Sequence, residues 1–358
     1  MRRKALASPG KTEIRVIENL RDLQSLRSAW QGLCNEAECS GSVFQTSQWV
    51  LPWCSTFSPR YIYVVTAWRH GRLAGLAPFF FPDGGNDLLF LGNPLNDEET
   101  FLVNRLEKHE IVAALFHAIL DNPRIRSFAA RTTADLSIVP DGPPPPDGVS
   151  AWKASAIGRE PGASLVLPQS WDEYLGCLTS LQKSKALYVL RRAETDLGIG
   201  FAVDSAPRIA PSEIHTLLKL REESMTHRGL WQLCPPAAKN SNFSCFVERI
   251  CSEAEAGSSG IYLAKLYSGK SLIAAGLYLS FQKTVMKYCQ GWATRLYRYS
   301  PGTLLDLKMI EWCIAKQIRI FEMGRGDEPY KRRLGAYVYE LTTWRFDKTE
   351  KAHAVRPE

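Results

Sequence analysis

Hydrophobic residues recur along the chain in short segments that alternate between the period of a strand and the period of a helix. Two apolar hairpins are the clearest of these segments: residues 61–81 turn at 70–72, and residues 261–281 turn at 268–270. Each hairpin precedes a strand, a helix with apolar residues at three-to-four spacing, and another strand. Strands that alternate with helices in this way predict a mixed α/β fold.

The first half of the chain follows this order. Residues 13–17 are expected to form a strand, and large apolar residues at three-to-four spacing over 20–33 predict a helix. A second helix opens at Phe44 and carries Trp53. The elements expected after the first hairpin are a strand over 88–91, a helix over 107–120 and a strand over 127–132.

The second half repeats this order. Its first helix is expected to start at Ser170, with Glu173 three residues later as in a capping box. The other expected elements are strands over 163–167, 201–204 and 284–292 and helices over 183–197, 211–228, 237–255 and 304–315. The repeat is weak in residue identity but clear in order, so it predicts an internal duplication.

The clearest break in the chain is the segment 141–148, in which four prolines stand between glycines. Proline does not fit a helix interior or a central strand. The segment is either a linker or a surface loop before a last strand of the first half over 151–156. We therefore predict a first half over residues 1–160 and a second half over residues 161–358.

Polar residues gather after the last strand predicted in the second half, which spans residues 319–323. Gly324 and Gly326 are expected to end that strand, and Pro329 fits the first position of a short helix. This turn lies at the carboxyl end of the strand, where open α/β sheets bind ligands. Its candidate catalytic residues are Asp327, Tyr330 and Lys331.

A second candidate site lies just upstream, at the start of the helix that precedes this strand. Ser300 is a good N-cap and Pro301 a good first helical residue. The free N–H groups of a helix start attract phosphate, and a glycine there permits close approach. The predicted phosphate-binding residues are Arg295, Tyr299, Ser300, Gly302 and Thr303.

These two segments carry a resemblance to a known family. The sequence Y-S-P-G-T-L-L at 299–305, with G-R-G-D-E-P-Y-K-R-R-L-G-A at 324–336, resembles the C-terminal core of GNAT-superfamily acyltransferases of the CelD type, which are associated with cellulose biosynthesis. Those proteins are similar to FemAB-type transferases, which carry two GNAT-like halves. The resemblance implies a tandem GNAT-like fold, acyl-CoA or acetyl-CoA as co-substrate, and no metal. The chain departs from the usual GNAT pyrophosphate loop, because Gly302 is the single glycine there.

The resemblance also implies a reaction in which an amine attacks a thioester directly. Such a reaction needs a base for the ammonium, donors for the oxyanion and an acid for the thiolate. Asp327 is the expected base, Tyr330 the expected acid, and Lys331 is expected to neutralise a phosphate or the oxyanion. The alternative is that Asp327 caps the short helix and Lys331 is a surface charge.

The loop 92–99 of the first half corresponds to the phosphate site of the second half, but it is acidic. Its three carboxylates would repel a phosphate, so the first half is interpreted as a degenerate copy and the donor is expected in the second. Asp97 and Glu98, together with Glu322, are predicted to bind the amine acceptor. An exposed, solvated loop is the alternative.

Composition agrees with a soluble globular protein. The 358 residues are enough for two domains. Lysine and arginine number 44 against 37 acidic residues, and the net charge of +7 suits an anionic ligand such as CoA, although an excess of this size is more often a solubility feature alone. The basic residues of the helix 183–197 are either a solvated face or a phosphate contact.

The cysteines and the longest apolar runs indicate in which cellular compartment the protein is expected. Nine cysteines without a C-x-x-C pair predict reduced thiols in a cytoplasmic protein. No apolar run approaches the ~20 residues of a membrane span. We therefore expect a cytoplasmic protein.

The sequence thus predicts an N-acyltransferase that moves an acyl group from a CoA thioester to an amine on a small molecule, a sugar or a peptide, with no role for DNA. One alternative is a FemAB-like transferase that takes an aminoacyl group from tRNA, bound by the basic residues at 183–192. The other is a non-catalytic accessory protein of polysaccharide biosynthesis.

Overall fold

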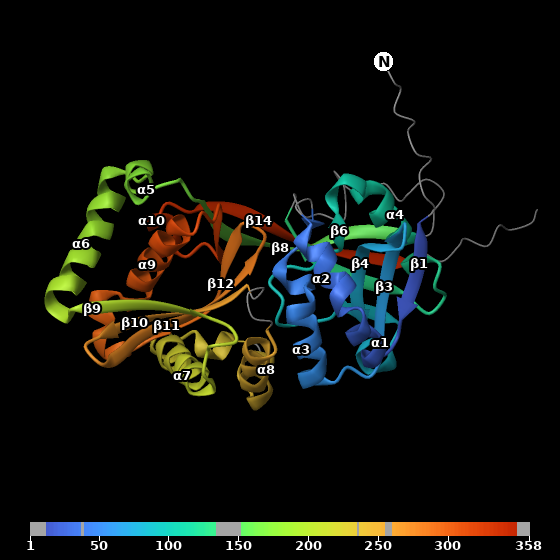
Figure 1. Cartoon of the computed structure of the whole chain (residues 1–358), viewed down its shortest axis with the longest axis horizontal. Helices are drawn as coiled ribbons and strands as arrows, with labels where there is room; N and C mark the ends of the chain where they lie inside the picture. Colours follow the sequence, from blue (N-terminus) through green and yellow to red (C-terminus); the bar gives the residue numbers. More distant parts are fainter. Residues whose placement is uncertain (1–11, 37–38, 134–151, 235, 255–259, 349–358) are drawn as a thin grey trace, which may run out of the picture. The chain divides into compact units, whose positions relative to one another are not determined.

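A computed structural model describes residues 12–36, 39–133, 152–234, 236–254 and 260–348. The chain divides into two compact units, residues 1–159 with 341–358 and residues 160–340. Each unit contains its own sheet and helices, which are labelled in Figure 1. The proline-rich segment 141–148 lies outside the described residues.

The first unit is built on a mixed sheet in the strand order β1-β3-β4-β5-β7-β14. These strands are Glu13–Ile17, Ile62–Arg69, Arg72–Phe80, Asp87–Phe90, Ser127–Thr132 and Tyr337–Lys348. A side ladder joins β2 (Cys39–Ser40) to β6 (Leu102–Asn104). The helices are α1 (Leu20–Ser25), α2 (Arg27–Asn35), α3 (Ser47–Phe57) and α4 (Lys108–Leu120).

The second unit repeats this plan in the order β9-β10-β11-β12-β13-β8. These strands are Ile199–Ser205, Ile261–Ser268, Ser271–Phe281, Thr284–Trp292, Ile320–Arg325 and Trp152–Val166. The helices are α5 (Trp171–Cys177), α6 (Ser180–Leu197), α7 (Pro211–His227), α8 (Ser241–Ser252), α9 (Pro301–Ala315) and α10 (Pro329–Arg333). Helices α6 and α9 lie on one face of the sheet, and α7 and α8 lie on the other (Figure 1).

Each unit has a parallel strand pair at the same place in its order. In the first unit β5 runs parallel to β7, and in the second β12 runs parallel to β13. A helix connects the two strands of each pair: α4 in the first unit and α9 in the second. The structure confirms the mixed α/β fold and both predicted hairpins, which are β3–β4 and β10–β11.

The closing strand of each unit pairs with a segment far from it in the sequence. Strand β8 leads into the second unit and pairs with β13 near the end of that unit. Strand β14 follows the second unit, and its Thr342–Asp347 segment pairs with β7 of the first. The predicted strands 151–156 and 163–167 are one strand in the structure, β8. Gly162 lies within it, and a Cβ there would lie 2.4 Å from the Tyr339 ring, so glycine is the residue that fits.

Two other local predictions differ from the structure. The helix expected over 20–33 is two helices, because the N–H of Leu26 bonds to the carbonyl of Leu23 and tightens the turn there. Strand β13 continues through Gly324, which has a φ of +73°, and ends at Arg325.

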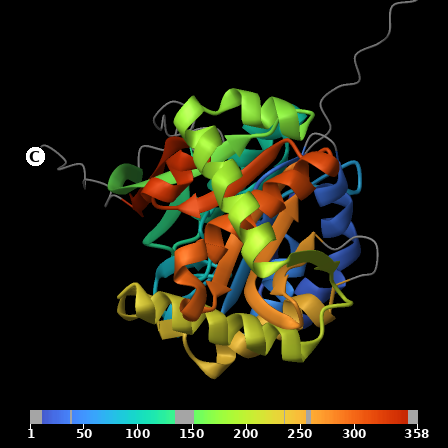
Figure 2. The same cartoon turned by 90° about the vertical axis from the view of Figure 1, so that its left-hand side faces the viewer.

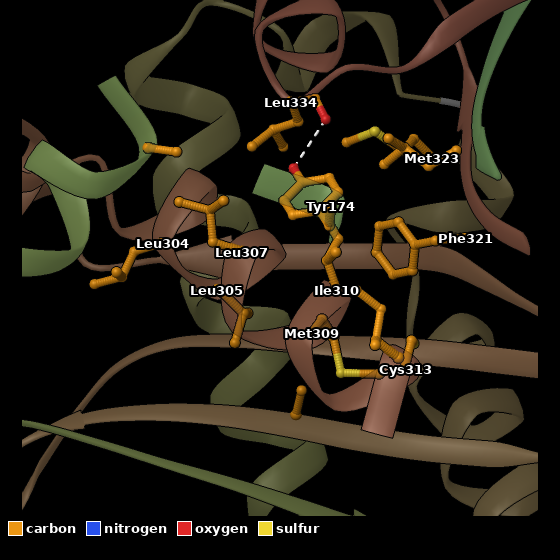
Figure 3. Packing of buried hydrophobic residues seen from close by; sticks show 14 of the residues in the cluster. Tyr174, Leu304, Leu305, Leu307, Met309, Ile310, Cys313, Phe321, Met323 and Leu334 are labelled. Carbon is orange, nitrogen blue, oxygen red and sulfur yellow. Dashed lines mark hydrogen bonds between the residues drawn. The ribbon is translucent and has the colours of Figure 1, made fainter. Parts of the chain in front are cut away.

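Helix α9 forms the centre of the second unit's core. Its apolar residues pack with Phe321 and Met323 of β13 and with residues of α5 and α6. Figure 3 shows this packing together with Tyr174 of α5, whose hydroxyl donates to the carbonyl of Leu334 at 2.9 Å. Figure 2 shows α6 lying across the α9 face of this unit. The end of α10 is thereby fixed to the core.

Candidate functional site

The parallel strands β12 and β13 of the second unit separate soon after they begin. Their pairing runs from Thr284 opposite Ile320 to Met286 opposite Glu322 and ends there. Beyond that point β12 continues along β11, and β13 continues along β8. We call the place where they diverge the strand split. Carboxyl ends that diverge in this way are where α/β sheets bind ligands.

Glu322 lies at the strand split. Its neighbours Phe321 and Met323 belong to the core on the α9 side, and side chains alternate along a strand, so Glu322 faces the opposite side. The carboxylate accepts a hydrogen bond from the Tyr339 hydroxyl at 2.7 Å and from the Gly324 N–H at 3.2 Å. Burial raises the pKa of Glu322 to about 7, although these hydrogen bonds oppose the shift. A carboxyl group of this pKa exchanges its proton near neutral pH.

The turn after β13 is held together by Lys331. Its side chain is buried, and its ammonium donates to the carbonyls of Gly324, Arg325 and Gly326 at 3.0, 2.6 and 3.0 Å. It also pairs with Glu328 at 3.1 Å. Burial lowers the pKa of Lys331. These contacts favour a structural role for the lysine, and its predicted catalytic role stays a prediction.

Asp327 occupies an exposed position in the same turn. Its carboxylate lies 3.6 Å from the Arg332 guanidinium, and both side chains are more than half exposed. The N-cap of α10 is Glu328, so Asp327 does not cap the helix. Its predicted role as the base stays a prediction.

Tyr330 is half-buried and belongs to a polar network inside the α9 side of the sheet. Its hydroxyl accepts a hydrogen bond from the ammonium of Lys287 on β12 at 2.9 Å. Lys287 also donates to Asp306 of α9 at 3.0 Å, and Gln290 of β12 donates to the other carboxylate oxygen at 3.1 Å. We call Lys287, Gln290, Asp306 and Tyr330 the Lys287 network.

Charge and burial act against each other in this network. Burial disfavours the charge of Lys287, but the Asp306 carboxylate and the Tyr330 phenol hold the lysine pKa above its ordinary value. Burial raises the pKa of Asp306 despite the lysine. Lys287 and Asp306 were not among the residues selected from the sequence. The available signals were Lys287, the one charged residue of the apolar segment 284–292, and Asp306, which stands between leucines in the segment 304–315.

The start of α9 lies beside the end of β12, because Gln290 also donates to the carbonyl of Gly302 at 3.0 Å. The first helical hydrogen bond runs from the N–H of Leu304 to the carbonyl of Ser300, so the N–H groups of Gly302 and Thr303 precede it. Ser300 is the N-cap residue, as predicted, but its side chain does not cap: its φ of +51° departs from the extended conformation that N-capping uses.

Basic and aromatic side chains surround this helix start. Arg295 and Arg298 are exposed. The guanidinium of Arg192 on α6 lies 4.6 Å from the centre of the Tyr299 ring and donates to the carbonyl of Arg298 at 3.3 Å. The five residues predicted to bind phosphate lie in the 3-10 turn 294–299 and at the start of α9, and Arg192 of α6 packs on one of them. Their phosphate-binding role stays a prediction.

The acidic loop of the first unit differs from the expectation of a solvated loop. Glu98 and Glu99 are buried, and the carboxylate of Glu99 accepts from the Asn93 amide at 2.9 Å. Burial raises the pKa of Glu99. The backbone N–H of Glu99 bonds to the carbonyl of Arg131 on β7. The loop thus packs into its own unit beside the strand that corresponds to β13, and the predicted acceptor role of Asp97 and Glu98 stays a prediction.

The described part of the chain shows neither a metal-binding group nor a membrane-spanning helix. No group of three or more histidine, cysteine, aspartate or glutamate residues there is arranged to hold a metal ion. Among the described helices, none has both the length and the apolar character needed to cross a membrane.

Comparison with known proteins places this architecture. Residues 182–332 match the family described as acetyltransferase (GNAT) domain. None of the curated proteins matches the chain in sequence. A crystal structure of FemX is similar with a TM-score of 0.58 and 11% identity, over 92% of this chain and 96% of that one. A conserved protein of unknown function from Bacteroides thetaiotaomicron has a TM-score of 0.53 and 10% identity, over 95% and 100%.

A third solved structure, a tandem GNAT protein from the clavulanic acid biosynthesis pathway, has a TM-score of 0.47 and 14% identity, over 95% of this chain and 100% of that one. Residues 182–332 are thus similar to a GNAT-type acetyltransferase domain, and the chain has a FemX-like mixed α/β fold. The predicted mixed α/β, FemAB-like fold class is confirmed. The resemblance to the CelD type stays a prediction.

Proposed function

We propose that this protein is an N-acyltransferase that moves an acyl group from a CoA thioester to an amine by direct attack, with its reaction site at the strand split of the second unit. The observation that carries the proposal is the buried carboxyl group of Glu322, whose pKa is about 7, at the point where β12 and β13 diverge. This placement makes Glu322, in preference to Asp327, the base that deprotonates the attacking amine.

The proposed acid and base lie on opposite faces of the sheet. Glu322 faces away from α9, whereas the Tyr330 hydroxyl is bonded to Lys287 on the α9 side. A thioester carbonyl at the strand split would then meet the amine from one face and release the thiolate to the other. The base takes a proton from the amine while the phenol of Tyr330 protonates the leaving sulfur.

The donor's phosphates are proposed to bind at the start of α9. The N–H groups of Gly302 and Thr303 and the positive end of the helix dipole favour an anion there. Arg295 and Tyr299 flank the same turn and complete the predicted set with Ser300. Both Gly302 and Thr303 are partly exposed, so a ligand can reach them.

The acceptor is proposed to be an amine on a small molecule, a sugar or a peptide, approaching Glu322 from the face away from α9. The predicted acceptor-binding role of Asp97 and Glu98 concerns the first unit and is separate from the site at Glu322. The role of Lys331 is proposed to be the fixing of the turn that carries Tyr330.

A second candidate donor is an aminoacyl-tRNA. The feature that favours it is the basic and aromatic face of α6, where Tyr188, Arg191 and Arg192 line an open hollow of about 560 Å³. Binding of tRNA through these residues would weaken steeply with salt. For each phosphate that the protein neutralises, a tenfold rise in salt should lower the affinity by roughly one power of ten. Binding of CoA has a much smaller salt dependence.

Acetyl-CoA is the probe that tests the proposal. At 100 times its Kd it should stabilise the protein by about 2.7 kcal/mol, seen as a rise in Tm, and label one of a panel of amines with acetyl groups. Gly302→Glu should abolish the Tm shift, because a Cβ there already lies 3.1 Å from the Trp292 ring and the carboxylate repels phosphate.

The matched control is Gly176→Glu on α5, where a Cβ has no atom within 4 Å. This variant should keep the full Tm shift. If millimolar acetyl-CoA does not shift the Tm of the parent protein, and tRNA binds in a salt-sensitive way, the CoA donor is wrong and aminoacyl-tRNA is the donor to test.

A further inference from the structure

The Lys287–Asp306 pair is a buried ion pair in the middle of an otherwise apolar core. The Asp306 side chain is 1% exposed and the Lys287 side chain 8% exposed. Removing two charges from water carries a large penalty, and well-packed apolar residues often replace such a pair without loss of stability. Stability alone therefore does not account for this pair, and its position suggests another role.

The hydrogen bonds of Lys287 fix where the proton of Tyr330 points. An ammonium only donates, so the bond of 2.9 Å between Lys287 Nζ and Tyr330 Oη uses a lone pair of the phenol oxygen. The phenol's own proton is therefore not in this bond and is directed elsewhere. Asp306 takes a second proton of the ammonium and so keeps it in place.

We propose that the Lys287–Asp306 pair positions Tyr330 as the proton donor to the leaving thiolate and stabilises the phenolate that this transfer leaves behind. The inference rests on the proposed acyl transfer. Tyr330 is the catalytic residue in it, and Lys287 and Asp306 are positioning residues that act through Tyr330.

The proton and electron balance closes without a further reactant. The amine nitrogen forms a bond to the acyl carbon, and its surplus proton goes to Glu322. The bond between the acyl carbon and sulfur breaks, and the sulfur receives the proton of Tyr330 to give the free thiol. The phenolate is held by the Lys287 ammonium until it regains a proton from solvent, and Glu322 releases its proton to solvent.

The same network connects the acid to the proposed donor site. The Gln290 amide donates to Asp306 at 3.1 Å and to the Gly302 carbonyl at 3.0 Å. One side chain therefore contacts both the counterion of Lys287 and the first turn of α9. A donor bound at that turn and the phenol of Tyr330 would then be held by one set of contacts.

Charged and titratable groups face Tyr330 from several elements. They are Tyr278 on β11, Lys287 on β12, Asp306 on α9, and Glu328 and Lys331 on or next to α10. Burial raises the pKa of Tyr330, and the Lys287 charge opposes this rise. The phenol is therefore protonated at neutral pH, as an acid must be, and Lys287 is the group whose removal should make its proton harder to release.

The first experiment measures the titration of Tyr330 directly. Protein labelled with ¹³C at the tyrosine Cζ is titrated by NMR, and the Tyr330 signal is the one missing from Tyr330→Phe. Because Lys287→Met alone leaves Asp306 unpaired and can unfold the core, the test variant is Lys287→Met with Asp306→Asn. We expect the Tyr330 midpoint to rise, because the charge and hydrogen bond of Lys287 lower the phenol pKa more than the Asp306 carboxylate raises it.

A matched control removes another buried lysine of the same unit. Lys265 of β10 is also buried and pairs with Asp204 and Glu213. Lys265→Met should leave the Tyr330 midpoint unchanged. An unmoved midpoint in the Lys287→Met/Asp306→Asn variant, or an equal movement in Lys265→Met, overturns the inference.

The second experiment varies the leaving group. Acetyl transfer from acetyl-CoA is compared with transfer from acetyl-thionitrobenzoate, whose thiolate needs no proton to leave. The Lys287→Met/Asp306→Asn variant and Tyr330→Phe should lose about 10²-fold or more in rate with acetyl-CoA and much less with the second donor. Equal losses with both donors overturn the role as an acid.

The two proposals fail in different ways. If the parent protein transfers no acetyl group, the proposed function fails, and with it the role of Tyr330 in catalysis, whatever the titration shows. If the parent transfers acetyl groups but the titration midpoint does not move, the proposed function stands and the inference about Lys287 and Asp306 is wrong.

Discussion

The two units share one strand order but differ at the parallel strand pair, which is β5 and β7 in the first unit and β12 and β13 in the second. In the first unit β5 and β7 pair at two positions, Asp87 opposite Ser127 and Leu88 opposite Phe128. The loop that follows β5 then bonds to β7 through the N–H of Glu99. In the second unit β12 and β13 pair for three residues and then follow different neighbours. In the first unit, the loop after β5 therefore lies beside β7. In the second unit, the segment after β12 does not pair with β13.

The residues around these two places explain the difference. The first unit's loop is long enough to reach β7, and it buries Glu98 and Glu99 among polar partners such as Asn93. In the second unit the chain leaves β12 through a short 3-10 turn and enters α9 at once. The two units thus share a strand plan, and the second unit has a buried carboxyl group and a phenol near the place where the first unit packs its own loop.

The largest effect expected from this comparison is on catalysis. Glu322→Gln should lower kcat/KM for acetyl transfer from acetyl-CoA by about 10²–10⁴-fold, the usual loss when a general base is removed. Glu99→Gln, which alters the buried carboxyl group of the first unit, should leave the rate unchanged, and Asp327→Asn should do the same. A large loss in Asp327→Asn with a fully active Glu322→Gln would restore Asp327 as the base.

The next effect is on stability and concerns the turn after β13. Lys331→Met leaves three carbonyls without their donor, so the free energy of unfolding should fall by about 3–4 kcal/mol, because a buried acceptor left without a hydrogen bond costs about 1–3 kcal/mol. The control is Arg332→Met at the next position, whose exposed ion pair with Asp327 is expected to contribute less than about 1 kcal/mol. Urea denaturation measures both. Equal losses in the two variants would show that Lys331 does not hold the turn.

The smallest effect is a pH dependence of stability. The pKa of Glu322 is about 7 in the folded protein against an ordinary value of 4.5. Between these values the folded state keeps a proton that the unfolded state has released, so this contribution is full below pH 4.5 and falls as the pH rises to 7. The total loss is about 3.5 kcal/mol at ~1.4 kcal/mol for each pKa unit.

Glu322→Gln removes this titration, so its stability relative to the parent should increase over that pH range. Urea midpoints measured from pH 5 to 8 test this. The pKa of Glu99 is raised as well, so Glu99→Gln should change with pH in the same direction. A constant difference between Glu322→Gln and the parent would mean that Glu322 titrates at its ordinary value and is a poor base at neutral pH.

The sequence by itself determined the features that depend on neighbouring residues. The turns at 70–72 and 268–270 and the apolar strands beside them form the two hairpins as predicted. Pro301 and Pro329 begin α9 and α10, because proline is favoured where a helix has no use for the N–H. Ser170 accepts the N–H of Glu173 at the start of α5, as the capping pattern indicates. The duplicated order of elements, and with it the fold class, followed from such local signals.

The tertiary structure alone decided the features that depend on residues far apart in the chain. The choice of β8 and β14 as closing strands joins segments more than 150 residues apart, and no local pattern specifies it. Lys287, Asp306 and Tyr330 meet across 19 and 43 residues of sequence. The raised pKa of Glu322 arises from burial by surrounding elements, and the turn's carbonyls draw the Lys331 ammonium inward. Charge, hydrogen bonding and burial become defined only when those segments pack together, so the sequence could name Tyr330 and Glu322 but not their environment.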